Sequence, residues 1–198
     1  MGKYRDVLER GGNLEGLLSA EGRLFQFSDA DFNDLVTGQT SFDETTPTFT
    51  IEVPSNTTAV VFEGTLSQTG TVAGDTVNVI VGVDNIAGRA SGGTTETPFC
   101  LRTDSPLGTV AAAGTGANKV IVYSNPTKAA GFGARLMGPQ PLGQDVSPAE
   151  GISNEILLPN GPIFLVGPAC YAVYAYAGTT GPTLGWSFRV GEFPTKEL

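Results

Sequence analysis

The sequence predicts an all-β fold, an antiparallel β-sandwich of the jelly-roll or Greek-key type with an extended N-terminal arm. From position 48 onward, runs of β-branched and aromatic residues alternate with polar ones and end at Gly, Pro, Asn or Asp. The 198 residues include 27 glycines and 13 prolines, which supply frequent turns. We find no long amphipathic helical pattern. About eight to ten short strands separated by regular turns are typical of a sandwich.

The length and composition indicate one folded domain with a sizeable core. Apolar residues make up 40% of the chain and charged residues 16%, which excludes a highly charged disordered protein. The sequence changes character near position 45. We therefore expect an N-terminal arm over residues 1–45 and a β-sandwich domain over residues 46–198.

The arm begins with a segment that can form one or two helical turns and that ends at Gly11 and Gly12. It then carries apolar side chains that can anchor it to another surface. We expect the arm to dock on a neighbouring subunit or a capsid, rather than complete its own core, through Leu14, Leu17, Leu18, Leu24 and Phe25.

The expected strands follow in order along the rest of the chain. They cover residues 48–53, 58–67, 75–84, 97–103, 107–112, 119–124, 155–158, 163–166, 171–177 and 184–190.

Three local features refine this prediction. In the second strand, Val60, Phe62 and Leu66 are expected to share one face. The last two strands are expected to form a hairpin across Gly178–Pro182. Residues 126–151, rich in Gly, Pro and Gln, are expected to form an irregular excursion or a functional loop.

The charge pattern argues against nucleic acid and membrane partners. The formal net charge is −9, and the eleven Lys and Arg residues are scattered, whereas phosphate binding needs them clustered. No run of about 18 apolar residues is present, and the start of the chain lacks the apolar core of a secretory signal. Cys100 and Cys170 lie in apolar strand-like contexts, so we expect buried thiols, with a disulfide as the alternative.

The absence of histidine from the chain is the main evidence against an enzyme. It removes Ser-His-Asp and Cys-His nucleophilic sites, imidazole metal ligands and the commonest general base. The Gly-rich segment Gly88–Gly93 lacks the lysine of a phosphate-binding loop. We therefore expect no catalytic residue and no cofactor.

Two carboxylate patterns offer candidate sites. Asp29, Asp31 and Asp34 could offer oxygen ligands to calcium, but their spacing departs from the EF-hand loop, so no metal site is expected. Glycoside hydrolysis needs two carboxyl groups at a set separation. The candidates for that alternative are Glu52, Glu63 and Asp84.

The aromatic residues near the C-terminus suggest a contact surface. Alternation places Tyr171 on one face of its strand and Tyr174 and Tyr176 on the other. One face is expected to pack in the core, and the face with Tyr174 and Tyr176 is expected to meet a partner or the arm. A sugar-stacking platform that also uses Trp186 and Phe188 is the alternative.

Several segments resemble small β-sandwich structural proteins of tailed-bacteriophage virions. The opening resemblance lies in residues 20–25 and 59–63, and the closing one in residues 157–161, 171–175 and 186–190. The resemblance implies a capsid decoration, cement or minor head protein, located in the virion after assembly in the host cytoplasm. It also implies a homo-oligomer, with a trimer favoured, that contacts capsid or other virion proteins, and it carries over no catalytic residue.

Two other functions remain open at this point. One is a carbohydrate-binding or host-adhesion module with the same fold, and the other is a jelly-roll subunit that forms the shell itself. Fold alone does not separate these functions.

Overall fold

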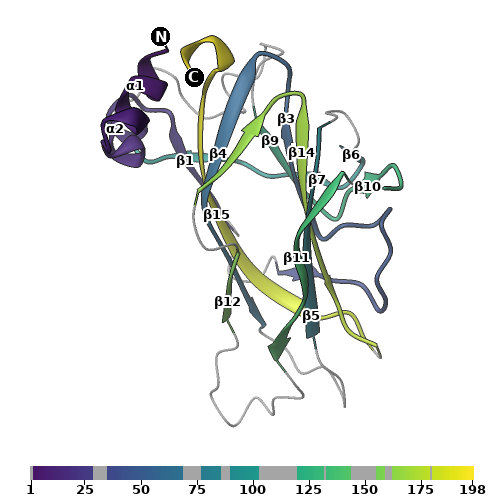
Figure 1. Ribbon diagram of the computed structural model, residues 1–198. Coiled ribbons are helices and arrows are strands. Elements are labelled where there is room, and N and C mark those ends of the chain that lie inside the picture. Colours follow the sequence, from purple (N-terminus) through teal and green to yellow (C-terminus); the bar gives the residue numbers. More distant parts are fainter. Residues whose placement is uncertain are drawn as a thin grey trace.

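The computed structural model describes residues 2–28, 35–68, 77–85, 90–102, 120–131, 133–143, 155–158, 162–178 and 180–198. Two antiparallel sheets face each other across an apolar interior, and Figure 1 shows them as two layers. The predicted all-β sandwich is thus confirmed. The helices are short, and both chain ends lie at the same end of the sandwich.

The first sheet contains β1 (Leu24–Ser28), β2 (Val36–Thr37), β4 (Thr57–Gln68), β8 (Phe99–Cys100), β12 (Glu155–Leu158), β13 (Ile163–Val166) and β15 (Thr183–Pro194). The second sheet contains β3 (Phe49–Val53), β5 (Val77–Asp84), β7 (Thr94–Thr95), β9 (Ile121–Ser124), β11 (Ala134–Gly143) and β14 (Ala169–Tyr176). A small separate ribbon pairs β6 (Ala90–Ser91) with β10 (Thr127–Lys128). The helices are α1 (Lys3–Glu9), α2 (Leu14–Ala20) and the 3₁₀ turn η2 (Thr195–Glu197).

The strand pairing is that of a jelly roll. Four antiparallel pairs are nested along the chain: β1 with β15, β3 with β14, β4 with β13, and β5 with β11. Successive pairs alternate between the sheets, so the chain is wound like one long folded hairpin. The sheets consequently run β1-β15-β4-β13 and β3-β14-β5-β11, which gives the eight strands of the jelly-roll architecture.

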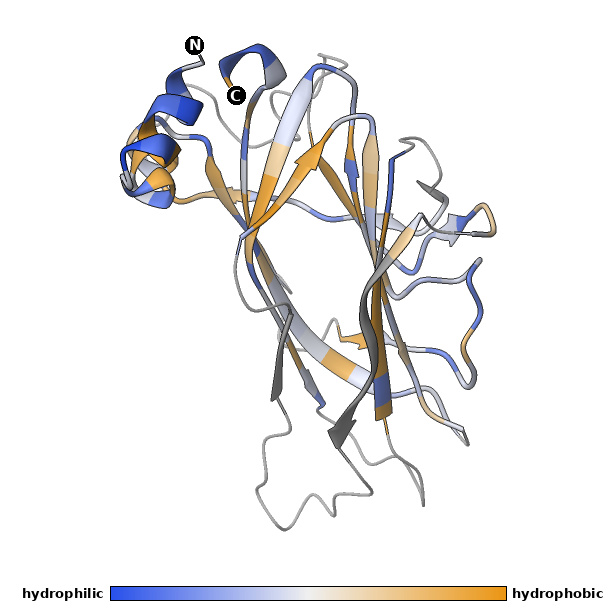
Figure 2. Cartoon of the chain, in the orientation of Figure 1, coloured by the Kyte–Doolittle hydropathy of each residue, from blue (hydrophilic) through white to orange (hydrophobic). Residues whose placement is uncertain are grey.

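The core lies between the sheets because each strand turns alternate side chains inward. On β15 these are Leu184, Trp186, Phe188 and Val190, the residues that the sequence places on one face. The ring of Phe49 from the opposite sheet lies 4.8 Å from Trp186 and 5.5 Å from Phe188, centroid to centroid. These aromatic contacts join the two layers, and Figure 2 shows the hydrophobic bands along the strands.

The predicted shared face of β4 is confirmed for Val60 and Phe62 but is wrong for Leu66. Val60 and Phe62 face outward, whereas Leu66 is buried between the sheets. The pairing with β15 shifts register between Arg189 and Val190, so one extra residue stands on β4 at this point. A bulge of this kind reverses the alternation beyond it.

The predicted C-terminal hairpin is also wrong. β14 pairs with β3 and β5 in the second sheet, and β15 pairs with β1 and β4 in the first. The turn-rich segment Gly178–Pro182 therefore connects the two sheets. Turn composition predicts a reversal of the chain, but it does not predict which strands then pair.

The Gly- and Pro-rich segment 126–151 contains regular structure that the sequence did not predict. β11 runs through it as an edge strand beside β5, with register shifts along the pairing. Pro139 and Pro141 are compatible with a strand here because an edge strand needs only one side for pairing. The expected strand at 97–103 is reduced to β8, and the one expected at 107–112 lies outside the described residues.

Two strands from the N-terminal 45 residues belong to the sandwich, whereas the sequence places the start of the sandwich domain at residue 46. β1 lies between β15 and β8, and β2 also pairs with β15. Alternation in the segment Leu24–Ser28 turns Phe25 and Phe27 into the core. The helical part before β1 lies outside the sheets. There Asn13 caps α2, its side-chain oxygen accepting from the Gly16 N–H at 2.9 Å.

Candidate functional site

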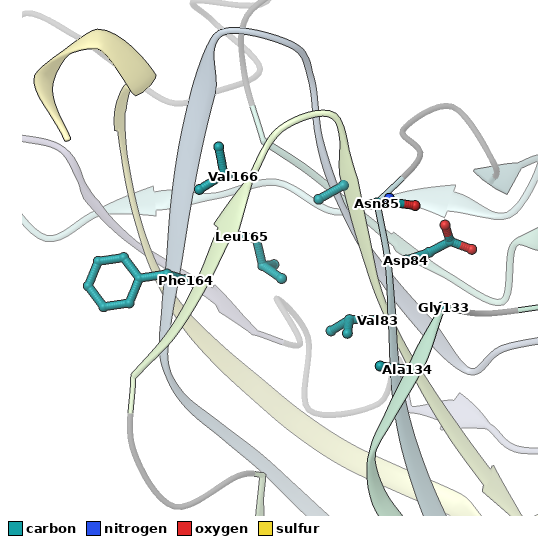
Figure 3. Close-up of a pocket in the computed structure, with 9 residues that line it drawn as sticks. Val83, Asp84, Asn85, Gly133, Ala134, Phe164, Leu165 and Val166 are labelled. Atoms are coloured by element: carbon teal, nitrogen blue, oxygen red, sulfur yellow. The ribbon is translucent and has the colours of Figure 1, made fainter.

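A pocket with a volume of about 380 Å³ opens between the two sheets beside β13 (Figure 3). Val83 and Leu165 point into it from opposite sheets, and Ala134 and Ala169 also line it. The side chain of Asp84 points away from Val83 and Leu165. Asp84 and Asn85 lie at its lining as well. The mainly apolar walls can hold an apolar group.

The three carboxylates considered for glycoside hydrolysis do not converge on this pocket. Glu52 and Asp84 are both in register with Cys170, from the two strands beside it. This register places Cys170, Glu52 and Asp84 on the outer face of the second sheet. Glu63 lies on the first sheet and forms an ion pair with Arg189. A catalytic pair needs both carboxyl groups at one sugar.

Metal ligation finds no support in the described part of the chain. No group of three or more His, Cys, Asp or Glu residues is placed there to hold an ion. The predicted acidic stretch with Asp29, Asp31 and Asp34 lies outside the described residues. Cys100 and Cys170 belong to different sheets, and both are thiols.

The predicted arm anchors contact the sandwich of their own chain. Leu14, Leu18 and Leu24 are buried with Tyr4, Val60 and Phe193 on the outer face of the first sheet, and Leu17 packs beside them, whereas Phe25 belongs to the core between the sheets. We define the helical clasp as residues 3–20, the two helices that cover this face. Apolar outward residues of β4 and β15 provide the surface on which it lies.

Glu21, the residue that directly follows the clasp, is the centre of its charged contacts. Its carboxylate accepts hydrogen bonds from Lys3 and from the Tyr4 hydroxyl, and Arg23 lies 3.7 Å away. Burial alone would raise the pKa of Glu21, but these hydrogen bonds and positive charges outweigh it, so the pKa lies below its ordinary value. Burial and the bond to Glu21 raise the pKa of Tyr4. The sequence gives no signal that Tyr4 is the buried residue of α1.

A second charged contact ties α2 to the first sheet. Arg189 of β15 lies 3.1 Å from the carboxylate of Glu15 and also pairs with Glu63 of β4. All three side chains are about one-third to two-fifths exposed. Pairs this exposed contribute little to stability on their own, but they orient the helix.

The face with Tyr174 and Tyr176 meets the N-terminal 45 residues of its own chain, which is one of the two partners expected for it. We define the strap as residues 39–47, which cross the outer face of the second sheet. Its Phe42 ring lies 5.2 Å from Tyr174 and 6.0 Å from Tyr176, centroid to centroid. The Tyr174 hydroxyl donates to the Glu44 carbonyl at 3.0 Å. Since only 2% of Tyr174 is exposed, burial raises its pKa, and nearby Cys170 and Glu44 raise it further.

Lys128 helps to hold the strap, a role that the sequence does not predict. Its backbone N–H donates to the Thr45 carbonyl at 2.8 Å. Its buried ammonium group donates to the carbonyls of Ala129 and Gly131, and the Gly131 N–H donates to the Glu44 carboxylate at 2.8 Å. Trp186 and Phe188 are buried in the core, so they offer no sugar-stacking platform.

An apolar edge is exposed on the first sheet at β8. Phe99 is 48% exposed and Leu101, just after the strand, is 43% exposed. Phe99 pairs with Gln26 of β1, and the Leu101 N–H donates to the Leu24 carbonyl at 3.0 Å. Among the described residues, only Leu8 and Val166 are other large apolar side chains exposed to this degree.

Comparisons with known proteins do not identify a relative. No protein-family model, no curated protein and no solved structure matches this chain. Within the described residues, no helix has the length and hydrophobicity to span a membrane.

Proposed function

We propose that this protein is a non-catalytic structural protein of a virion, a capsid decoration, cement or minor head protein that stabilises the shell by homo-oligomeric assembly. The observation that carries the proposal is the jelly roll with its interior filled by apolar side chains. Double-sheet jelly rolls are used in viral capsid and lectin domains. Such a fold can work through its outer surface, since most of the described space between the sheets is filled by packed side chains.

The exposed edge at β8 supports assembly. Edge strands have unpaired backbone groups, and an apolar edge favours pairing with another chain. Phe99 and Leu101 lie two residues apart, so they share a side of this edge. A homo-oligomer, with a trimer as the favoured state, would cover them. Capsid proteins are the other partners of the proposed function.

Mass spectrometry of purified phage particles tests the location of the protein. We expect this chain in stoichiometric amounts in particles and its loss to lower their resistance to heat or low salt. Its absence from particles would contradict the virion function.

Light scattering on the isolated protein tests the assembly surface. We expect an oligomer at micromolar concentration, and we expect the double variant Phe99→Ser and Leu101→Ser to shift it toward monomer. Val166→Ser is the matched control, since Val166 is 47% exposed but lies on β13 at the other edge of the first sheet. A parent protein that is monomeric throughout would contradict assembly through this edge.

A further inference from the structure

The helical clasp packs on the sandwich through a hydrophobic cluster of its own. Tyr4, Leu14 and Leu18 meet Val60 and Phe193 in this cluster. Figure 1 shows the two helices at one end of the sandwich, beside β1. None of the clasp residues belongs to the cluster between the sheets. The described core therefore stays complete if the clasp moves away, which is the condition for a locally opening unit.

The linker between the clasp and the sandwich is short and contains a glycine. α2 ends at Ala20 and β1 begins at Leu24. Gly22 between them has a φ of +69°, a left-handed conformation that suits glycine. A rotation at these linking residues moves the clasp without disturbing the pairing of β1 with β15.

Carboxylates are at the centre of the electrostatic contacts that hold the clasp. Glu21 faces Lys3 and Tyr4 of α1 and also Arg23, and Glu197 of η2 acts on the same tyrosine. On the sheet side, Arg189 of β15 faces Glu15 of α2 and Glu63 of β4. Protonation of Glu21 removes its attraction to the positive charges of Lys3 and Arg23, which are the charges that face it.

We propose that the helical clasp is an acid-released cover that opens as a unit when Glu21 is protonated, exposing the apolar outer face of the first sheet while the jelly roll stays folded.

The direction of the pH dependence follows from Glu21. Its folded-state pKa lies below the ordinary value, so its stabilising contribution is present above the unfolded pKa and is lost as the pH falls through the folded pKa. The ordinary pKa of glutamate is about 4.3, so the clasp begins to open below that pH. The exposed surface then includes Leu24, Val60 and Phe193.

Hydrogen exchange measured by mass spectrometry on the full chain tests this proposal. After correction for the pH dependence of the chemical exchange rate, acidification from pH 7 to below 4 should accelerate exchange in peptides from residues 3–20 before it does so in β5 and β14. At pH 7, Glu21→Gln should accelerate exchange in the clasp at least about tenfold, the size expected for losing hydrogen bonds to a charged group. β5 and β14 should stay protected in this variant.

Glu9→Gln is the matched control. Glu9 lies on α1 and pairs with Arg5 on the exposed side, at 2.8 Å, away from Glu21. It should leave exchange in the clasp within about twofold of the parent, as expected for a surface pair. If clasp and sheet strands exchange together in acid, or if Glu21→Gln matches Glu9→Gln, the proposal is wrong.

Discussion

The ring of Tyr4 lies 4.2 Å from the ring of Phe193, centroid to centroid, so the first helix of the chain packs on the end of its last strand. Both side chains are almost completely buried. Residues near the two ends of the sequence thus meet on the outer face of the first sheet. The contact links α1 to the jelly roll, since β15 lies in the middle of that sheet.

Tyr4→Ala should loosen this contact specifically. Truncating a fully buried aromatic side chain costs about 3 kcal/mol or more. The loss should appear as faster hydrogen exchange in α1 and α2, with smaller changes in β5 and β14. Leu8→Ala is the control because Leu8, on the same helix, is 39% exposed. Equal effects of the two variants would show that Tyr4 does not anchor the clasp.

Tyr171 and Tyr174 should respond oppositely to loss of the hydroxyl. Tyr171 faces the core, and its buried hydroxyl has no hydrogen-bond partner among the described residues. Tyr171→Phe should therefore leave the free energy of unfolding unchanged or raise it by up to about 1 kcal/mol. Tyr174→Phe removes the hydrogen bond to the Glu44 carbonyl and should lower the free energy of unfolding by about 1 kcal/mol. Denaturant unfolding measures both, and a clear loss in Tyr171→Phe would contradict the expectation.

High pH should destabilise the protein through the same tyrosines. Burial raises the folded-state pKa of Tyr171, and burial together with acidic neighbours raises that of Tyr174. Their stabilising contribution is present below the ordinary tyrosine pKa of about 10 and is lost as the pH rises above it. Ultraviolet titration of phenolate absorbance should show the hydroxyls of Tyr171 and Tyr174 ionising above the ordinary tyrosine pKa, at the pH where the protein unfolds. Ionisation of all tyrosines near the ordinary value in folded protein would refute this.

Removing Phe42 should uncover part of the strap surface. Phe42→Ala takes away the ring that covers Tyr174 and Tyr176. The pKa of Tyr174 should fall toward its ordinary value because water gains access to the hydroxyl. The same ultraviolet titration, run below the unfolding transition, measures the change. Phe99→Ala is the control, since Phe99 is exposed and lies in the other sheet.

The sequence predicts most strands because alternation is a local property. Val77, Val79 and Val81 of β5 follow the period of two and are buried between the sheets, and so do the inward residues of β15. The bulge on β4 could not be predicted, since it depends on the register with β15. The sequence did not predict β11 for a related reason, because a strand with prolines is tolerated only at the edge of a sheet.

The candidate surfaces were predicted in part. The sequence correctly separates the two faces of β14, with Tyr171 toward the core and Tyr174 on the other side. It does not reveal that Phe42 covers that side, because side chains distant in sequence meet only through the strand order. Similarly, the apolar residues Leu14 and Leu18 indicate a docking segment, but their pattern does not identify the face that receives them.

Two truncations should separate the clasp from the jelly roll. Deleting residues 1–22 removes α1 and α2 but leaves β1 and the whole cluster between the sheets. The shortened protein should keep the β circular dichroism of the parent and unfold cooperatively, while its newly exposed Leu24, Val60 and Phe193 should bind a hydrophobic dye and promote association. Deleting residues 1–28 also removes β1 and with it Phe25 and Phe27, which should abolish cooperative thermal unfolding, since each buried aromatic contributes about 3 kcal/mol or more. If the first deletion unfolds the protein as completely as the second, the clasp is part of the folding core and not a cover on it.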